Sequence, residues 1–181
     1  MSSSRVPAAL SQITLVLGGA RSGKSRYAEG LIEAAAASAT YCATAEAGDA
    51  EMAARIAAHR ARRCAFWHTV EAPLALAAAI ADHAAADRPV LIDCLTLWLS
   101  NLLGAGCDID AETAALVAAL RGADGPVVLV ANEVGLGLVP QTPLGRHFRD
   151  AAGRLNQEIA ALADRVVFIA AGLPLTLKGE G

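Results

Sequence analysis

A glycine-rich segment that joins an apolar run to a helical pattern constrains the fold of this chain more than any other feature. The apolar run, residues 12–17, is short and rich in β-forming residues, which is typical of a buried strand. Gly18 and Gly19 end it, and a helical pattern follows from about Lys24 to Ala37. A strand, a glycine-rich turn and a helix in this order predict the first unit of an α/β fold.

The same segment, residues 18–25, satisfies the pattern G-x-x-x-x-G-K-[ST], whose mechanism is the binding of phosphate groups. Its glycines let backbone N–H groups turn inward around phosphate oxygens, and the helix N-terminus adds positive potential. Lys24 is expected to reach the β- and γ-phosphates, and the Ser25 hydroxyl to bind Mg²⁺. A chance glycine-rich turn is the alternative, but strand, loop, Lys, Ser and helix are all in register. The expected nucleotide contacts here are Gly18, Gly19, Ala20, Arg21, Ser22, Gly23, Lys24 and Ser25.

Apolar runs and helical patterns alternate along the rest of the chain. Further strands are predicted at residues 40–44, 66–70, 89–93, 126–131 and 165–170, the last as a final central strand. Further helices are predicted at residues 50–63, 73–86, 95–103, 110–121 and 144–163, with glycine loops at 104–106 and 132–140. Continuously apolar strands that alternate with helices indicate a mostly parallel central sheet with helices on both faces. We therefore predict a doubly wound α/β domain of the P-loop NTPase-like class.

Composition agrees with one such domain and excludes several other classes of protein. Of the 181 residues, 55% are hydrophobic and 43 are alanine, which excludes a disordered tail and a disulfide scaffold. The mean hydropathy is +0.42, yet no run of about 18 apolar residues is free of charge, so we expect no integral membrane protein. We expect one domain over residues 1–181, with residues 1–11 as a flexible N-terminal extension.

Charge and cysteine content narrow the partners and the compartment. A net charge of −3 gives no overall basic surface, so we expect no nucleic acid partner. The four cysteines include no C-x-x-C pair and no cluster at zinc spacing, which favours reduced thiols. The N-terminus carries no export signal, so a cytoplasmic location is expected.

An acidic residue, Asp93, ends the strand predicted at residues 89–93. It can hold the Mg²⁺ shell or a nucleotide hydroxyl, or it can merely cap the next helix. We favour the functional role, since the carboxyl ends of parallel strands form the ligand side of an open sheet.

The sequence features up to this point predict a P-loop nucleotide enzyme and leave its class open. A motor, a switch, a DNA-dependent ATPase and a small-molecule kinase all fit. The acidic pI of about 5.8 and the lack of a basic or aromatic groove count against a DNA motor. A switch GTPase would need an N-K-x-D motif, whereas Asn132 is followed by Glu133.

A histidine among arginines is the second chemical signal. At about 100° per residue, one face of the helix predicted at residues 50–63 carries Glu51, Arg55, His59 and Arg62. Nearby cations disfavour the imidazolium form, which leaves His59 available as a nucleophile, and the same arginines can bind phosphates. From these residues alone, a solvated basic helix end with Arg60 and Arg63 is the favoured interpretation.

Other polar residues are less informative. His68 and His83 are expected on the surface. Arg146, Asp150 and Arg154 have i, i+4, i+8 spacing, which fits an intrahelical ion-pair ladder, a basic wall over a triphosphate or a subunit contact. The sequence leaves open the roles of Asn132, Glu133, His147 and Arg154.

Five ordered segments are more specific than the phosphate loop alone. They are GGARSGKSRYAE at 18–29, EMAARI at 51–56 with His59 and Arg60, TVE at 69–71, NEVGLGLVP at 132–140 and RHFRDAAGRLNQ at 146–157. Together they resemble the bifunctional adenosylcobinamide kinase/adenosylcobinamide-phosphate guanylyltransferase family of cobalamin biosynthesis, over residues 13–178.

The resemblance implies two reactions in one chain. In the first, ATP or GTP phosphorylates the aminopropanol hydroxyl of adenosylcobinamide. In the second, His59 attacks the α-phosphate of GTP, releases pyrophosphate and passes GMP to adenosylcobinamide phosphate, which gives adenosylcobinamide-GDP. This reverses the interpretation of His59, since the family carries its guanylylated histidine in this helix. Where some relatives have a second histidine, this chain has Ala58.

The resemblance also implies binding residues, a metal and an assembly. Glu71 and Asp93 are expected to accept hydrogen bonds from a guanine edge or a ribose hydroxyl, although many relatives have Glu in place of Asp93. Mg²⁺ is expected to enter with the nucleotide, without a tightly bound organic cofactor, and the family forms trimers. The positions that match nucleotide contacts outside the phosphate loop are Ala43, Thr44, Ala45, Arg60, Ala61, Arg62, Arg63, Glu71 and Asp93.

Two other hypotheses stay open on the sequence. One is a P-loop kinase of another small alcohol with a structural His59, and the other is a non-catalytic nucleotide-binding regulator. The phosphate loop does not fix the choice of ATP or GTP, and the sequence does not show where the corrinoid docks.

Overall fold

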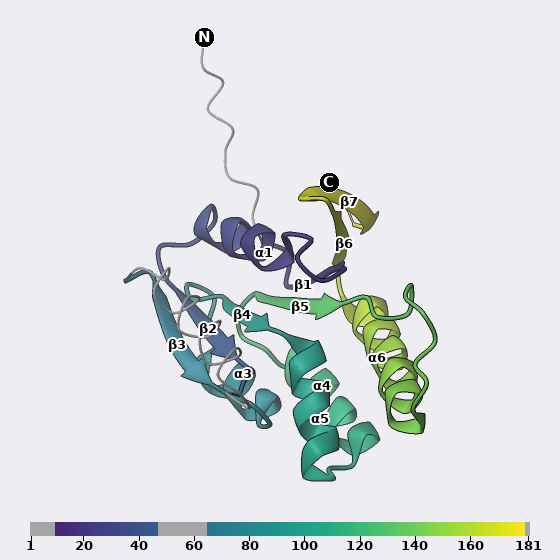
Figure 1. Cartoon of the computed structure of the whole chain (residues 1–181). Helices are drawn as coiled ribbons and strands as arrows, with labels where there is room; N and C mark the ends of the chain where they lie inside the picture. Colours follow the sequence, from purple (N-terminus) through teal and green to yellow (C-terminus); the bar gives the residue numbers. More distant parts are fainter. Residues whose placement is uncertain (1–9, 47–64, 180–181) are drawn as a thin grey trace.

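A computed structural model describes residues 10–46 and 65–179 (Figure 1). Strands and helices alternate along these residues, as the pattern of apolar runs predicts. The elements are β1 (Ile13–Gly18), α1 (Lys24–Glu33), β2 (Ala39–Ala43), β3 (Trp67–Glu71), α3 (Leu76–His83), β4 (Val90–Asp93), α4 (Leu95–Ala105), α5 (Ile109–Arg121), β5 (Val127–Asn132), α6 (Pro143–Leu162), β6 (Arg165–Ala170) and β7 (Leu173–Lys178).

The described strands form one seven-stranded sheet in the order β3-β2-β4-β5-β1-β6-β7. All neighbouring pairs are parallel except β6 and β7, which are antiparallel. The strand β3 lies at one edge of the sheet. Parallel strands place their carboxyl ends at the same edge of a sheet, where ligands of open α/β folds bind.

Helices cover both faces of the sheet, which confirms the predicted fold class (Figure 1). On one face α1 packs with Ala28 and Ile32 against Val16 and Val128. On the other face α3, α4, α5 and α6 bury a larger cluster that includes Trp98. All six residues of β1 are buried, which explains why the strand reads as a continuous apolar run.

Two helices are shorter than predicted. The sequence predicts α1 to about Ala37, but it ends at Glu33, whose carboxylate accepts a hydrogen bond of 3.0 Å from Trp67 Nε1. The sequence also predicts α3 over residues 73–86, but it covers only Leu76–His83. Alanine favours helix at every position, so the alanine pattern overestimates helix length where the chain must return to the sheet.

Helix α4 is longer than predicted. Gly104 and Ala105 belong to the helix, and Gly106 ends it in the left-handed conformation with φ of 69°. The predicted loop at 104–106 therefore shrinks to the cap, because glycine at the C′ position satisfies the last carbonyls of a helix.

Residues 165–170 form β6, which pairs with a strand on each side as expected of a central strand, but the expectation that it is the last strand is wrong. Antiparallel β7 follows β6 and forms the edge of the sheet. Its Pro174 is tolerated because an edge strand leaves one row of backbone N–H groups unpaired. The alternation of Leu173, Leu175 and Leu177 is a strand signal that the sequence analysis missed. All three leucines are exposed, by 71%, 59% and 57%.

Within the described ranges, none of the helices combines the length and the hydrophobicity that crossing a bilayer requires.

Candidate nucleotide site

The phosphate loop follows β1 at the carboxyl edge of the sheet and leads into α1 (Figure 1). Gly18 has φ of 155°, and a Cβ there would lie 2.5 Å from the Ile169 carbonyl oxygen and 2.7 Å from Ser22 Oγ. Gly23 has φ of 100° and is the N-cap of α1. Both positions therefore require glycine, because an L side chain would clash at the first and be strained at the second.

Lys24 lies at the mouth of this loop and is 7% exposed. Its Nζ donates a hydrogen bond of 2.7 Å to the Gly19 carbonyl. Burial lowers the pKa of Lys24, while Cys94 and Asp93 act in the opposite direction. Lys24 follows the loop after β1 and Asp93 ends β4, so both predicted residues lie at the carboxyl edge of the parallel strands.

Asp93 is held by a tyrosine from the neighbouring strand. Tyr41, 2% exposed in β2, donates a hydrogen bond of 2.6 Å from its hydroxyl to Asp93 Oδ2. A hydrogen bond to a charged acceptor is stronger than a neutral one and fixes the orientation of the carboxylate. No local spacing reveals Tyr41, because it lies 52 positions from Asp93 and meets it only through the pairing of β2 with β4.

The carboxyl ends of three neighbouring strands, β3, β2 and β4, lie side by side at this edge of the sheet. Ala43 pairs with Glu71 of β3 on one side and with Asp93 of β4 on the other. Glu71 is exposed at the end of β3. The two carboxylates predicted to accept from a guanine or a ribose therefore lie on strands that flank β2.

Thr44 has a structural contact that the sequence does not show. Its buried hydroxyl accepts a hydrogen bond of 2.7 Å from the Cys94 N–H and donates one of 2.8 Å to the Cys94 carbonyl. Asn101 of α4 donates to the Thr44 carbonyl at 2.8 Å. The Thr44 side chain thus joins the ends of β2 and β4, and the Ala43 carbonyl accepts a hydrogen bond of 2.9 Å from the Ala72 N–H.

Cys94 follows Asp93 directly but is unsuited to act as a nucleophile. Burial raises its pKa to about 11, with Asp93 adding to the shift. Burial likewise raises the pKa of Cys42 to about 12. Both residues are neutral thiols near pH 7, and the thiolate is the reactive form.

The side-chain oxygens around the phosphate loop suit a divalent cation that binds together with a nucleotide. Ser25 is the second residue of α1, and the Ser22 hydroxyl is buried without a partner in the protein. In the described part of the chain, no group of three or more His, Cys, Asp or Glu residues could hold a metal on its own. Mg²⁺ is typically bound by one or two protein ligands together with phosphate oxygens, which fits Ser25 and Asp93.

Asn132 and the following loop lie beside the phosphate loop, because Asn132 pairs with Gly18 in the sheet. The Asn132 N–H donates to Thr96 Oγ1 at 2.7 Å, and Asn156 Nδ2 donates to the Asn132 carbonyl at 3.3 Å. Glu133 Oε1 accepts from the Gly135 N–H at 2.6 Å. These contacts shape the backbone after β5, and the sequence analysis missed the roles of Thr96 and Asn156.

The predicted ion-pair ladder of α6 is not formed among the described residues. Arg146 donates instead to the carbonyls of Pro140 and Gln141, at 3.2 and 2.7 Å. Asp150 lies 3.8 Å from Arg149. Arg146 therefore fastens the loop before the helix, since its long side chain reaches back over the N-cap.

The predicted nucleophile and its basic neighbours, His59, Arg60, Ala61, Arg62 and Arg63, lie outside the described residues. The remaining histidines are described. His68 is exposed on β3, and His83 is half-buried with its ring centroid 5.9 Å from that of His68.

Comparison with known sequences gives one consistent family. The family described as cobinamide kinase / cobinamide phosphate guanyltransferase matches residues 14–177. The bifunctional adenosylcobalamin biosynthesis protein CobP of Pseudomonas aeruginosa is 54% identical over 170 residues, covering 92% of this chain and 97% of that protein. The bifunctional adenosylcobalamin biosynthesis protein CobU of Salmonella typhimurium is 44% identical over 179 residues, covering 91% and 98%.

Solved structures of other proteins share the fold at low sequence identity. An ATPase from the type III secretion system of pathogenic bacteria has a TM-score of 0.55 at 13% identity, covering 92% of this chain and 57% of that one. A Pyrococcus horikoshii structure, project PH0250, has a TM-score of 0.56 at 8% identity, covering 96% and 89%. These similarities concern the α/β fold alone.

Proposed function

The chain belongs to the cobinamide kinase / cobinamide phosphate guanyltransferase family, and we propose which of its residues take part in each of the two reactions. The chain is a bifunctional enzyme of cobalamin biosynthesis, with both a kinase and a guanylyltransferase activity. The observation that supports the proposal is that the phosphate loop with Lys24 and the Asp93 carboxylate both lie at the carboxyl edge of the parallel strands.

In the proposed kinase step, the phosphate loop holds the nucleoside triphosphate through its backbone N–H groups. The aminopropanol hydroxyl oxygen of adenosylcobinamide attacks the γ-phosphorus, and the nucleoside diphosphate leaves. Lys24 stabilises negative charge on the transferring group and on the leaving oxygens. Ser25 and Asp93 would hold Mg²⁺, which neutralises phosphate charge when bound. Tyr41 keeps the Asp93 carboxylate in place.

In the proposed guanylyl step, His59 is the nucleophile. An imidazole nitrogen forms a bond to the α-phosphorus of GTP as the bond to pyrophosphate breaks. The phosphate oxygen of adenosylcobinamide phosphate then attacks the same phosphorus, and the bond to His59 breaks. A covalent intermediate splits one transfer into two easier ones. The nearby arginines favour a neutral imidazole and bind the leaving pyrophosphate.

Base and ribose recognition are assigned to the row of strand ends beside the loop. Glu71 and Asp93 flank Ala43 in the sheet and offer carboxylate oxygens to a guanine edge or a ribose hydroxyl. The backbone of Ala43 and Ala45 provides further polar groups. Arg60, Ala61, Arg62 and Arg63 complete the proposed GTP contacts.

A labelling experiment tests the nucleophile. Incubation with [α-³²P]GTP should give a protein label that is labile in acid and stable in base, as expected for a phosphorus–nitrogen bond. His59→Ala should abolish the label. The matched control is His68→Ala, which removes an exposed imidazole from β3 and should leave the label intact. A label that persists in His59→Ala refutes the assignment.

We also assign the enzyme to the cytoplasm and to a homo-oligomer, a trimer by family resemblance. Three cysteines of the described chain, Cys42, Cys94 and Cys107, are free thiols, which suits a reducing compartment. The exposed leucines of β7 supply apolar area for a contact between copies.

A further inference from the structure

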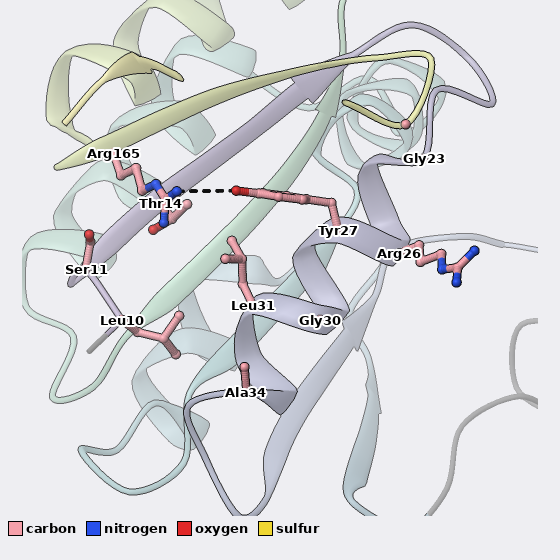
Figure 2. A pocket seen from close by; sticks show the side chains of 11 residues that line it. Leu10, Ser11, Thr14, Gly23, Arg26, Tyr27, Gly30, Leu31, Ala34 and Arg165 are labelled. Carbon is pink, nitrogen blue, oxygen red and sulfur yellow. Dashed lines mark hydrogen bonds between the residues drawn. The ribbon is translucent and has the colours of Figure 1, made fainter. Parts of the chain in front are cut away.

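A pocket of about 620 Å³ lies beside α1, on the side that faces β6 (Figure 2). Helix α1 packs mainly on β1, β4 and β5. Val167 and Ile169 of β6 are buried on the same face, so of this strand only Arg165, at its first position, lines the pocket. The pocket runs from Gly23, at the start of α1, to Ala34, just past its end. Its size is typical of small-molecule sites in proteins.

A cation without a counter-ion lines this pocket. Arg165 is half-buried, and no carboxylate in the described part of the chain lies within ion-pair distance of it. Its Nη2 donates to the Tyr27 hydroxyl at 3.3 Å, and its buried Nε has no hydrogen-bond partner among residues 10–46 and 65–179. The carboxylate of Asp164, next in sequence, already accepts from the Ile13 N–H at 2.9 Å. A guanidinium is a permanent cation, and removing it from water without a partner is unfavourable.

The rest of the lining combines donors with apolar surface. Figure 2 shows Arg165 and Tyr27 facing each other, with Thr14 beside Arg165 and with Leu31 and Leu10 close by. Because the Tyr27 hydroxyl accepts from Arg165, its own proton is free to be donated to a ligand. None of the residues that line the pocket is acidic. Such a lining matches an anion that also carries an apolar portion.

We propose that this pocket binds a small molecule in which an oxyanion group, carboxylate or phosphate, is joined to an apolar body. Arg165 and Tyr27 would bind the oxyanion, and Leu10 and Leu31 would pack against the apolar part. The pocket borders the phosphate loop at Gly23, but the proposed oxyanion site lies at Arg165, the first residue of β6, whereas the phosphate loop lies at the carboxyl edge of the sheet. The proposal does not depend on the activity of the enzyme.

The chain contains two tyrosines, which makes a site-specific test possible. Protein labelled with 3-fluorotyrosine should give two ¹⁹F signals, one from Tyr27 in the pocket and one from Tyr41 beside Asp93. The signal that disappears in the Tyr27→Phe variant is that of Tyr27, and the remaining one is that of Tyr41. Phenyl phosphate and benzoate are the probes. Inorganic phosphate and phenol, the two parts of phenyl phosphate, are titrated separately for comparison. We expect at least one probe to shift the Tyr27 signal saturably, and about tenfold more tightly than either half.

Variants and competition make the test specific. Arg165→Gln should weaken probe binding about tenfold or more, since it removes a charged donor, while Arg165→Lys should recover part of it. Arg121→Gln is the control, because it removes the same charge from the exposed end of α5, and Arg121 does not line the pocket. It should change the dissociation constant by no more than about twofold. An unshifted Tyr41 signal shows that each variant is folded. Excess ATP should leave the Tyr27 titration unchanged.

Three results would overturn the proposal. The first is the absence of a saturable Tyr27 shift with either probe. The second is an equal loss of binding in Arg165→Gln and Arg121→Gln, which would indicate only general electrostatic attraction. The third is loss of the shift with ATP, which would place the probe in the phosphate loop.

Discussion

At the scale of single residues, the charge state of Lys24 depends on Asp93, and the position of the Asp93 carboxylate depends on Tyr41. Burial lowers the pKa of Lys24 and so disfavours its charged form, while the Asp93 carboxylate favours it. The position of that carboxylate depends on the 2.6 Å hydrogen bond from Tyr41. Tyr41 therefore acts on the phosphate site without contacting the nucleotide, as a positioning residue.

The Tyr41→Phe substitution tests this dependence. Phenylalanine keeps the edge contact with Trp67, whose ring centroid lies 5.7 Å away, but loses the donor to Asp93. We expect the kcat of the kinase step to fall about tenfold and the half-saturating Mg²⁺ concentration to rise, because a hydrogen bond to a charged group is lost. Steady-state kinetics at varied Mg²⁺ measures both.

The control is the same change at the other tyrosine. Tyr27→Phe removes a hydrogen bond to Arg165, away from Asp93, and should leave both kinetic values unchanged. Wild-type Mg²⁺ dependence in Tyr41→Phe would show that Asp93 does not need this hydrogen bond.

At the scale of elements, the sequence predicts strands better than helix ends. Each of the predicted strands agrees with β1 to β6 within one or two residues, because strands buried on both faces are continuously apolar. Alanine-rich segments do not mark where α1 and α3 end, since tertiary contacts such as Trp67 with Glu33 decide this. Strand β7 was missed because its alternating leucines are exposed and stand beside a proline.

Of the candidate site, the sequence predicts the segment that is contiguous along the chain, but not the contacts between residues that are far apart in sequence. Residues 18–25 form a contiguous motif, and their loop geometry follows from strand, glycine and helix in sequence. The Tyr41–Asp93 contact and the Thr44 link to Cys94 depend on the register of β2 with β4, which no local pattern contains. The predicted helix with His59 lies outside the described residues, so that part of the site stays a prediction.

The junction of β1 with the phosphate loop gives a test of element packing. Gly18→Ala would place a Cβ 2.5 Å from the Ile169 carbonyl of β6. We expect the free energy of unfolding to fall by about 1–3 kcal/mol, because backbone cannot yield as a side chain can. Urea denaturation measures this.

Gly19→Ala is the matched control for that substitution. A Cβ at Gly19 would meet no atom within 4 Å, so the variant should unfold within about 0.5 kcal/mol of the wild type. Equal stability of the two variants would contradict the tight junction of β1, β6 and the loop.

At the scale of the whole molecule, the proposed reactions and the proposed contact between copies are assigned to different strands of the sheet. The phosphate loop, Asp93 and Glu71 lie at the carboxyl ends of the parallel strands. The leucines of β7 lie at the far edge, beyond β6. The net charge of −3 therefore does not reveal this local arrangement, in which the phosphate loop carries cationic residues and the edge strand β7 carries exposed leucines.

Substitution in β7 tests the proposed homo-oligomer. Replacing Leu173, Leu175 and Leu177 by lysine should convert the protein to a monomer in sedimentation velocity, because charge opposes burial of this edge. Leu138→Lys, at a loop position that is 95% exposed, is the control and should sediment like the wild type. An oligomer that survives the triple substitution would place the interface elsewhere.

The central claim is that one chain phosphorylates adenosylcobinamide and then guanylylates the product through His59. The most direct measurement is mass spectrometry of the corrinoid products formed by His59→Ala with ATP and GTP. We predict that adenosylcobinamide phosphate accumulates and that no adenosylcobinamide-GDP forms, whereas the wild type converts one into the other. Formation of adenosylcobinamide-GDP by His59→Ala, or loss of the phosphorylation step in that variant, would contradict this division of labour.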